Sequence, residues 1–443
     1  MQVDWVPDTD GNGTSCPPSN NNQEIDTPHV DIPAIDIDAY VSQYRSQFRI
    51  QRLLFVADHC APLRAEALQH AFNAVQNTLN VECFKTIRAR QAAIGVTPSP
   101  EDSPWIEATS RRAAQRQERL ESDLSSYKSN SIKESIRRAH VDLGDHWVDC
   151  GDLQKALRCY SQARYYTTAP RHIVAMCFNV IKVVLLLRDW NQVLGYVSKA
   201  EMSCSSDLNA NELTRLHVAA GIAYMALGQY RAAAKRFSKA IVDHCPEDFV
   251  SPSCVAWYGG LCSLASLPRQ ELIEVVTALR GWLETEPIVR DALSAFHSSD
   301  YSTCFRLIDT PVLLLDPYIA SRVAELNNLL RRRALCQYLS AYNRVDMMKM
   351  SRAFNTDSAA LQTELAQLIQ DGHIAARIDS SSKVLHACEV DARTSSFEAA
   401  INAGRAYQRR TAIMLVRCAV SRHQLLLRQG KDSDHSSGRT SPV

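Results

Sequence analysis

Apolar residues recur every three to four positions along most of the chain, which is the period of an α-helix that buries one face. Between residues 140 and 310 the pattern also repeats over a longer interval. Three segments align without gaps: GDHWVDCGDLQKALRCYSQA from Gly144, IKVVLLLRDWNQVLGYVSKA from Ile181 and GIAYMALGQYRAAAKRFSKA from Gly221. They begin 37 and 40 residues apart, and such a period is typical of stacked pairs of helices.

The aligned columns carry side chains of matching size, with alanine where neighbouring pairs would touch. These columns are Trp147/Val184/Tyr224, Leu153/Trp190/Tyr230, Tyr160/Val197/Phe237, Ser161/Ser198/Ser238 and Ala163/Ala200/Ala240. Gly151 and Gly228 lie between the two halves, and glycine readily adopts the left-handed conformation that follows a helix end. One pair cannot bury its own apolar face, so the pairs must stack. The pattern predicts a right-handed, tetratricopeptide-like solenoid over residues 131–316, with a degenerate further copy near Asp300.

A different module is predicted over residues 317–390. ALCQYLSAYNRVDMMKMSRAFN predicts a helix, a break and a second helix. DSAALQTELAQLIQDG predicts a third helix that Thr356 or Asp357 caps and Gly372 ends. IAARID and KVLHAC then alternate around residues 380–382 as the two strands of a small hairpin. Three helices followed by a two-stranded wing is the order of a winged-helix domain.

The remaining chain divides into helical segments and polar ends. Residues 35–130 are predicted to be helical, broken by GVTPSPEDSP. Residues 395–428 predict one long helix that is apolar over much of its circumference, and such a helix needs several neighbours. The polar residues 429–443 cannot supply them, so we expect other chains to do so. Residues 1–34 are rich in Pro, Asn and Gly and are predicted to be a disordered acidic arm.

The formal net charge of +1 conceals an asymmetry along the chain. Eight acidic residues and no Lys or Arg precede Arg45, whereas residues 395–431 hold six Arg and one Lys against Glu398 alone. Each end could meet a partner of opposite sign, or both could be solvated faces. Arg405, Arg409 and Arg410 are the candidate contacts for an acidic partner.

Cysteine usage and hydropathy indicate a reducing compartment. The chain has 14 Cys but no C-x-x-C, and most Cys lie within apolar helical patterns, where a free thiol behaves as a small buried hydrophobe. No signal-peptide pattern begins the sequence, and the apolar run VIKVVLLL near residue 180 is too short to span a bilayer. We therefore expect a soluble protein of the nucleus and cytoplasm with no membrane partner.

Catalytic and cofactor-binding motifs are missing from the sequence. It contains no G-x-x-x-x-G-K-[ST], G-x-G-x-x-G, G-x-S-x-G or H-E-x-x-H, and no zinc-isopeptidase pattern. The sequence leaves open whether a Cys and a His form a nucleophile pair. With 14 Cys and 13 His, some are expected to lie close to each other by chance. The third helix of the winged-helix module carries Asp357, Glu364 and Asp371 and no cation, which argues against nucleic-acid binding. We assign no catalytic residue, metal ligand or cofactor.

Helical repeats that run into a winged helix and a terminal helix resemble the PCI family of scaffold proteins. Within it, SIRRAHVDLGDHWVDCGDLQKALRCYSQARYYTT, MMKMSRAFNTDSAALQTELAQLIQDGHIAARIDSSSKVLHA and FEAAINAGRAYQRRTAIMLVRCAVSRHQLLLR resemble the subunit 1 family of the COP-9 signalosome. The resemblance covers residues 35–428. It implies a mostly α fold: a helical-repeat solenoid, a winged-helix PCI module and a long C-terminal helix.

The resemblance also implies a function and partners. The expected role is a non-catalytic scaffold in the complex that removes a ubiquitin-like modifier from cullins and so regulates cullin–RING ubiquitin ligases. The expected partners are other PCI subunits and a zinc-isopeptidase subunit. Winged helices would pair edge to edge through residues 374–378 and 383–387, and the terminal helices would form a bundle. The implied wing contacts are Ile374, Ala375, Arg377, Lys383 and Leu385. The implied bundle contacts are Tyr407, Ile413, Met414, Val416, Val420 and Leu427.

Two alternatives remain open at the level of sequence. A proteasome-lid scaffold would have the same architecture, although the Gly-Asp repeat and the QRR terminal helix favour the signalosome. A nucleic-acid-binding PCI protein would require Arg409 and Arg410 and would bind less tightly as salt increases. The basic run at residues 331–333 is interpreted as a solvated helix face, with a nuclear signal as the alternative.

Overall fold

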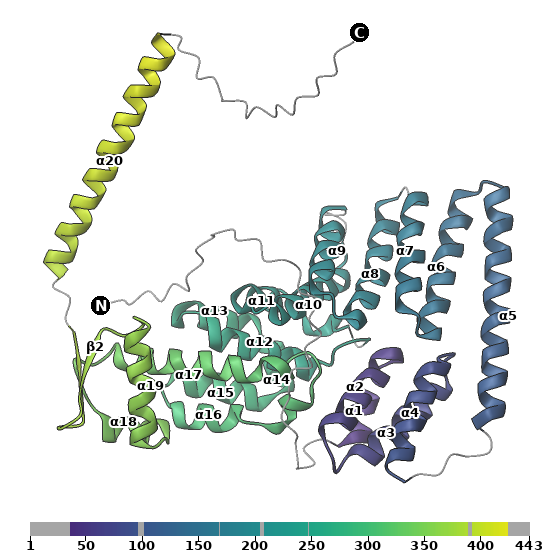
Figure 1. Ribbon diagram of the computed structural model, residues 1–443, viewed down its shortest axis with the longest axis horizontal. Helices are drawn as coiled ribbons and strands as arrows, with labels where there is room; N and C mark the ends of the chain where they lie inside the picture. Colours follow the sequence, from purple (N-terminus) through teal and green to yellow (C-terminus); the bar gives the residue numbers. More distant parts are fainter. Residues whose placement is uncertain are drawn as a thin grey trace, which may run out of the picture.

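The computed structural model describes residues 36–95, 102–167, 169–203, 208–246, 248–388 and 392–423. The acidic arm at residues 1–34, the tail and Leu427 lie outside these ranges. The described chain is almost entirely helical, with a small sheet near its C-terminal end (Figure 1). This architecture confirms the predicted order of helical solenoid, winged-helix module and terminal helix.

Five helices form the N-terminal region. They are α1 (Ile37–Ser42), α2 (Ser46–His59), α3 (Arg64–Gln76), α4 (Val81–Ala93) and α5 (Asp102–Ser129). The first four helices enclose a core of their own, in which Leu53, Phe72 and Phe84 are buried. Helix α5 is the long helix that runs beside α4 and α6 at the outer edge of the molecule (Figure 1). Half-buried Trp105, near its start, stacks on Phe84 with ring centroids 4.2 Å apart.

The three aligned segments fold as three consecutive helical pairs. The pairs are α6 (Lys133–Cys150) with α7 (Leu153–Ala163), α8 (Pro170–Leu187) with α9 (Trp190–Ser203), and α10 (Ala210–Ala226) with α11 (Tyr230–Phe237). A 3-10 turn, η1 (Arg164–Tyr166), follows α7, and η2 (Val242–His244) follows the third pair. Ala163 and Ala200 are fully buried and Ala240 nearly so, as expected for the column that lets neighbouring pairs approach.

The turn inside each pair has the same hydrogen-bonded geometry. The amides of Asp152, Asp189 and Gln229 donate to carbonyl oxygens five residues earlier, at 2.9, 3.2 and 2.9 Å. Gly151 and Gly228 adopt the predicted positive φ, at 87° and 79°. The middle pair has no glycine at this position, and there the left-handed residue is Arg188 itself, with φ 59°.

Helix α8 is longer than the apolar run that the sequence suggested. HIVAMCFN extends the run, so the helix has 18 residues with a mean hydropathy of 1.6. Among the described helices it is the one whose length and composition would suffice to cross a membrane. Its apolar residues are accounted for by packing, because Cys177, Val180 and Val184 are fully buried in the solenoid core.

The solenoid continues into the C-terminal half of the chain. The further helices are α12 (Pro252–Ser266), α13 (Arg269–Ala278), α14 (Arg280–Thr285), α15 (Pro287–His297) and α16 (Tyr301–Ile308). Helices α15 and α16 are the degenerate further copy. The amide of Asp300 donates to the carbonyl of Ala295 at 2.9 Å, and Ser299 takes the left-handed position with φ 66°. Two 3-10 turns follow, η3 (Pro311–Leu315) and η4 (Ala320–Arg322).

The winged-helix module contains one strand more than the sequence predicted. Its elements are α17 (Val323–Leu339), β1 (Arg344–Asp346), α18 (Met347–Phe354), α19 (Ser358–Gln370), β2 (Ala376–Asp379) and β3 (Val384–Ala387). The sheet is antiparallel with the order β1-β3-β2. Asp357 stands at the N-cap of α19, and Gly372 follows the helix with φ 75°. The core of the module continues into the solenoid core, so the two are packed as one body.

Helix α20 (Ala392–Arg422) is the last element and has 31 residues. Figure 1 shows it beyond the winged-helix end, apart from the packed helices. The side chains from residue 393 to 423 are exposed, except that Thr411 and Val420 are half-buried.

Candidate assembly surfaces

The wing residues predicted as contacts have different positions in the sheet. Strand β2 is an outer strand, and Arg377 on it is exposed, as is Ala375 just before it. Ile374 is half-buried and packs against the core of the module. Lys383 is exposed in the turn before β3, in the left-handed conformation with φ 53°.

The prediction that residues 383–387 form an edge strand is wrong. Strand β3 lies in the middle of the sheet because β1 pairs with it on the side away from β2. Leu385 is only 2% exposed and belongs to the internal core, so it cannot be a contact for another subunit. The two outer strands are β1 and β2.

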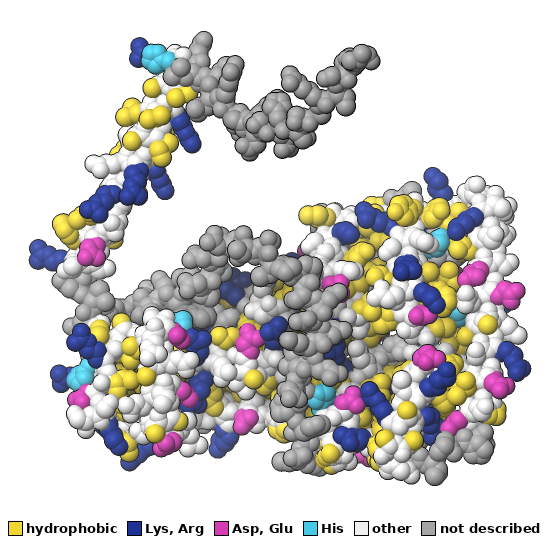
Figure 2. Space-filling view, in the orientation of Figure 1, with side chains coloured by type: hydrophobic (Ala, Val, Ile, Leu, Met, Phe, Trp, Pro, Cys, Tyr) yellow, Lys and Arg dark blue, Asp and Glu magenta, His cyan; other side chains and the backbone are white. Residues whose placement is uncertain are grey.

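The apolar residues of α20 face solvent on all sides of the helix. Successive residues of an α-helix point about 100° apart, so four in a row cover its circumference. The four residues from Ile413 to Val416 are all more than half exposed, and Tyr407 is 72% exposed. Figure 2 shows hydrophobic side chains gathered on the half of the helix that is farther from the winged-helix module. A helix of this kind is stable in water only when neighbours enclose it.

Basic residues are spread along α20 from its start to its last turn. Arg405, Arg409 and Arg410 are exposed near the middle of the helix, where Figure 2 shows a band of basic side chains. The helix therefore exposes both apolar and basic side chains. Val420, which was predicted to be a bundle contact, is half-buried.

The three basic residues 331–333 on α17 make contacts within the protein. Arg331 Nε donates to Glu364 Oε2 at 2.8 Å, and Arg332 Nη2 donates to Asp371 Oδ2 at 3.4 Å. Arg333 donates to the carbonyl of Leu264 at the end of α12, and burial lowers its pKa to about 10. These contacts tie α17 to α19 and α12. The interpretation of the run as a solvated face is therefore corrected, and the contacts favour a structural use of all three side chains over a nuclear signal.

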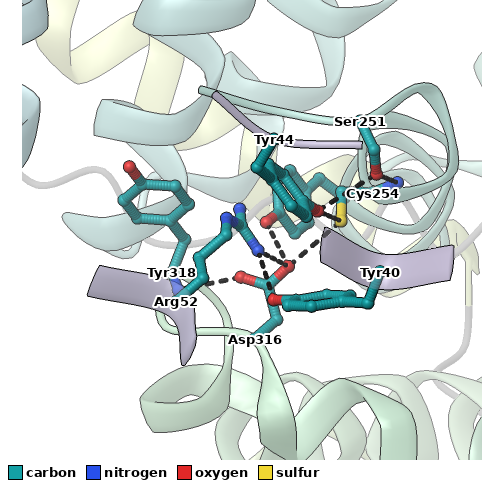
Figure 3. Close-up of polar contacts among 8 residues, drawn as sticks. Tyr40, Tyr44, Arg52, Ser251, Cys254, Asp316 and Tyr318 are labelled. Atoms are coloured by element: carbon teal, nitrogen blue, oxygen red, sulfur yellow. Dashed lines mark hydrogen bonds and ion pairs between the residues drawn. The ribbon is translucent and has the colours of Figure 1, made fainter. Parts of the chain in front are cut away.

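A buried charged junction joins the N-terminal helices to the turns that precede the winged helix (Figure 3). Arg52 on α2 is 2% exposed, and its Nη1 lies 3.2 Å from Asp316 Oδ2. The same carboxylate oxygen accepts hydrogen bonds from Tyr258 Oη at 2.6 Å and from Cys254 Sγ at 3.2 Å. The other carboxylate oxygen accepts from the amide of Tyr318 at 3.0 Å.

Aromatic rings enclose the arginine of this junction. The guanidinium carbon of Arg52 lies 4.2 Å from the ring centroid of Tyr44 and 5.1 Å from that of Tyr318. Its Nε and Nη2 have no hydrogen-bond partner among the described residues, so the ring faces supply the remaining attraction. Burial on its own would raise the pKa of Asp316, but the Arg52 charge and the Tyr258 hydroxyl hold it below the usual range.

The structure places one Cys close to one His, but their pKa shifts are not those of an activated nucleophile pair. Cys150 Sγ lies 3.6 Å from His146 Nε2 on α6. Burial raises the pKa of the Cys150 thiol and lowers the pKa of His146. A thiolate–imidazolium pair needs both shifts in the opposite direction. Within the described ranges, no group of three or more His, Cys, Asp or Glu residues is placed to hold a metal ion.

Two family models match the chain, one on the solenoid and one on the winged helix. The model of 26S proteasome subunit RPN7 matches residues 102–275, and the PCI domain model matches residues 307–388. The second match begins near the start of η3 and ends with β3. It therefore covers the helices and all three strands of the winged-helix module.

Curated relatives match nearly the whole chain. COP9 signalosome complex subunit 1b of Drosophila melanogaster is 40% identical over 95% of this chain and 90% of its own length. COP9 signalosome complex subunit 1 of Arabidopsis thaliana is 35% identical over 90% of this chain and 92% of its own. A proteasome relative, 26S proteasome non-ATPase regulatory subunit 6 of Oryza sativa, is 23% identical over 65% of this chain and 75% of its own. With this identity, this coverage and the same succession of solenoid, PCI module and terminal helix, the chain belongs to the family of COP9 signalosome subunit 1.

Proposed function

We propose that this chain is a non-catalytic scaffold subunit of a signalosome. In this role it supports removal of the ubiquitin-like modifier from cullins and so regulates cullin–RING ubiquitin ligases. The observation that carries the proposal is helix α20, whose apolar residues are exposed on every side. A surface of that kind serves assembly with other chains, and the family membership names the assembly.

The proposed contacts follow from the surfaces that the structure leaves exposed. Tyr407, Ile413, Met414 and Val416 would enter a bundle formed with the terminal helices of other PCI subunits. Ala375 and Arg377 at the β2 edge would meet a neighbouring winged helix. The zinc-isopeptidase activity would belong to another subunit of the same particle. We also propose that the complex works in both the nucleus and the cytoplasm.

The test is purification of the tagged chain from native extract, followed by sizing and mass spectrometry. A single large particle that contains a zinc-isopeptidase subunit and other PCI chains is the expected result. Turnover of modified cullin is expected from that particle and not from the purified chain alone. Metal-dependent turnover by the isolated chain would contradict the scaffold proposal, and recovery as a lone chain would contradict the assembly.

A proteasome-lid scaffold is the second candidate. The match of the RPN7 model to residues 102–275 favours it. The proteasome relative is less similar and covers less of the chain than the signalosome relatives do. The same purification separates the two candidates, because a lid subunit would bring proteasome base subunits with it.

A further inference from the structure

Two exposed hydrophobic side chains occupy the same column of neighbouring repeats. Tyr165, on η1 after α7, is 88% exposed, and Met202, in the last turn of α9, is 83% exposed. Each comes two residues after the last alanine of its aligned segment. In the third repeat Ile241, one position earlier in the alignment, is 48% exposed. Exposed apolar side chains that gather in one place mark an interaction site on a soluble protein.

Three cations accompany these apolar residues. Arg164, Lys199 and Lys239 are exposed, and each lies within three residues of one of the apolar side chains. Among the ion pairs of the described ranges, none includes any of the three cations. The Nζ atom of Lys199 instead lies 4.4 Å from the ring centroid of Tyr196. Figure 2 shows hydrophobic side chains, with Lys and Arg side chains beside them, over the upper ends of α7, α8 and α9.

The first two of these cations lie close to one buried thiol. Burial raises the pKa of Cys177 on α8 to about 11, and the charges of Lys199 and Arg164 both oppose this rise. Charges affect a pKa in this way only over short distances. The end of α9 and the turn after α7 therefore contribute to the same surface.

An ion pair joins the ends of the second and third pairs. Glu201, which immediately precedes Met202, pairs with Arg236 on α11, one turn before Lys239. The pair neutralises the carboxylate, and Asp243 is the exposed carboxylate that follows on this side. The described residues thus keep an excess of positive charge. We call the six side chains the repeat-end surface: Arg164, Tyr165, Lys199, Met202, Lys239 and Ile241.

The sequence before α1 contains a segment of complementary chemistry. Residues 1–10, MQVDWVPDTD, combine Val3, Trp5 and Val6 with three aspartates and no cation. The apolar side chains of this segment match the apolar part of the repeat-end surface, and its carboxylates match the cations.

The chain that connects this segment to α1 is long enough to reach the surface. Gln51 on α2 donates a hydrogen bond to the carbonyl of Leu186, near the C-terminal end of α8. The repeat-end surface lies at the opposite end of that helix, whose 18 residues rise about 27 Å. A flexible chain as long as residues 10–36 spans about 25–30 Å on average and up to about 85 Å when extended.

We propose that residues 1–10 bind the repeat-end surface of the same chain, with Trp5 against Tyr165 and Met202. The aspartates of the segment face the cations of the surface. A tethered segment has an effective concentration of the order of millimolar, so a weak contact is sufficient within one chain but not between two copies. A partner that uses this surface must displace the segment, which makes residues 1–10 an intramolecular competitor. The inference goes beyond the proposed function, because the surface lies on the solenoid and not on the winged helix or α20.

A photo-cross-linker in place of Tyr165 tests which segment covers the surface. The full-length chain would carry p-benzoylphenylalanine at this position, and cross-linked peptides would be identified by mass spectrometry. We expect a cross-link to residues 1–10, with a yield that does not change on tenfold dilution. The control position is Tyr342 on the winged-helix module, which is 52% exposed and should give no cross-link to this segment. Absence of the cross-link from Tyr165, or an equal yield from Tyr342, would overturn the proposal. In a mixture of isotopically labelled and unlabelled chains, a cross-link between the two kinds would show that a second copy binds and would overturn it as well.

Substitutions in the segment and in the surface test the chemistry of the contact. Trp5→Ser and the double variant Lys199→Glu with Lys239→Glu should each lower the cross-link yield about fivefold, since a few exposed contacts change an equilibrium constant by about that factor. The matched control is Lys349→Glu with Arg352→Glu, two exposed cations on α18. Asp4→Lys with Asp8→Lys should restore the yield of the Lys199/Lys239 variant. Circular dichroism verifies that each variant is folded. Equal yields from the two double variants, or no rescue by the added lysines, would reject the inference.

Discussion

Apolar side chains are largely buried in the body of this protein, which comprises the described residues up to 388, but they are exposed in its last helix, α20. In α8 the apolar side chains are enclosed by neighbouring helices of the same chain. In α20 they are exposed on every side. Burying a large aliphatic side chain is worth about 1.5–3 kcal/mol, so the body stabilises itself, whereas α20 can realise this free energy only with other chains. Under the proposed function, folding and assembly therefore depend on separate segments of the sequence.

Deleting α20, residues 392–422, should separate the two regions most clearly, because it should affect assembly and not folding. We expect incorporation into the particle to be lost, because under the proposed function the exposed apolar residues of the helix enter the bundle. The thermal midpoint of the remaining chain should stay unchanged, because its core does not involve α20. Co-purification measures the first effect and circular dichroism the second.

A milder variant of the same test is Met414→Glu, for which Glu398→Gln in the other half of the helix is the control. If the chain without α20 still entered the particle, the proposal that assembly depends on this helix would be wrong.

Within the body, a single substitution in the charged junction should lower the free energy of unfolding more than the other substitutions proposed below. Arg52→Met leaves Asp316 buried without its cation, and loss of one partner of a buried pair costs about 3–5 kcal/mol. We expect a lower midpoint of urea-induced unfolding, followed by circular dichroism. The double variant Arg52→Met with Asp316→Leu removes both charges and should recover most of this loss. A single variant as stable as the unaltered protein would show that the junction does not hold the N-terminal helices.

The sequence predicted the repeats and missed the junction for a physical reason. Periodic apolar positions, the turn glycines and the alanine column are local signals that a single chain displays directly. Arg52 and Asp316 lie 264 residues apart, and no short-range pattern connects them. No local motif in the sequence distinguishes their partners Tyr44 and Tyr258 from other aromatic residues.

The edge of the winged helix was predicted only in part for a similar reason. Strand β1 has three residues, too few to show an alternating pattern in the break between two helices. In a predicted sheet without β1, β3 is an edge strand and Leu385 on it becomes a candidate contact for another subunit. The α20 contacts came from the family resemblance and the apolar pattern of the helix, and the structure exposes most of the described ones without testing what they touch.

The aligned repeats differ in the size of the residue at their first position, which is glycine in the first and third repeats and isoleucine in the second. A methyl group at Gly221 would lie 2.6 Å from the ring of Phe237, and one at Gly144 would lie 2.5 Å from Tyr160. The middle repeat has Ile181 and Val197 at these two columns, so size is exchanged between the facing positions. Gly221→Ala should therefore destabilise the solenoid by about 1–3 kcal/mol through overpacking.

The control is Gly195→Ala, on an open face of α9, which should stabilise its helix by about 0.5–1 kcal/mol. Gly221→Ile combined with Phe237→Val copies the middle repeat and should recover part of the stability lost in Gly221→Ile alone. Urea-induced unfolding measures all four variants. Equal effects of the Gly221 and Gly195 substitutions would refute the exchange of size.

The smallest effect is expected at the turn of the middle repeat. Arg188 holds the left-handed conformation, which costs a residue with a Cβ roughly 1–2 kcal/mol relative to the right-handed one, and glycine adopts it freely. Arg188→Gly should raise stability by less than about 1 kcal/mol, because glycine also loses more entropy on folding. The reverse change at the corresponding position, Gly228→Arg, should lower stability by a similar amount, since a Cβ there would make only an ordinary contact, 4.0 Å from Glu325 Oε1, and the strain lies in the backbone. Urea-induced unfolding measures the change in the free energy of unfolding for each substitution. Changes of opposite sign would show that the repeats share one turn geometry whatever residue occupies it.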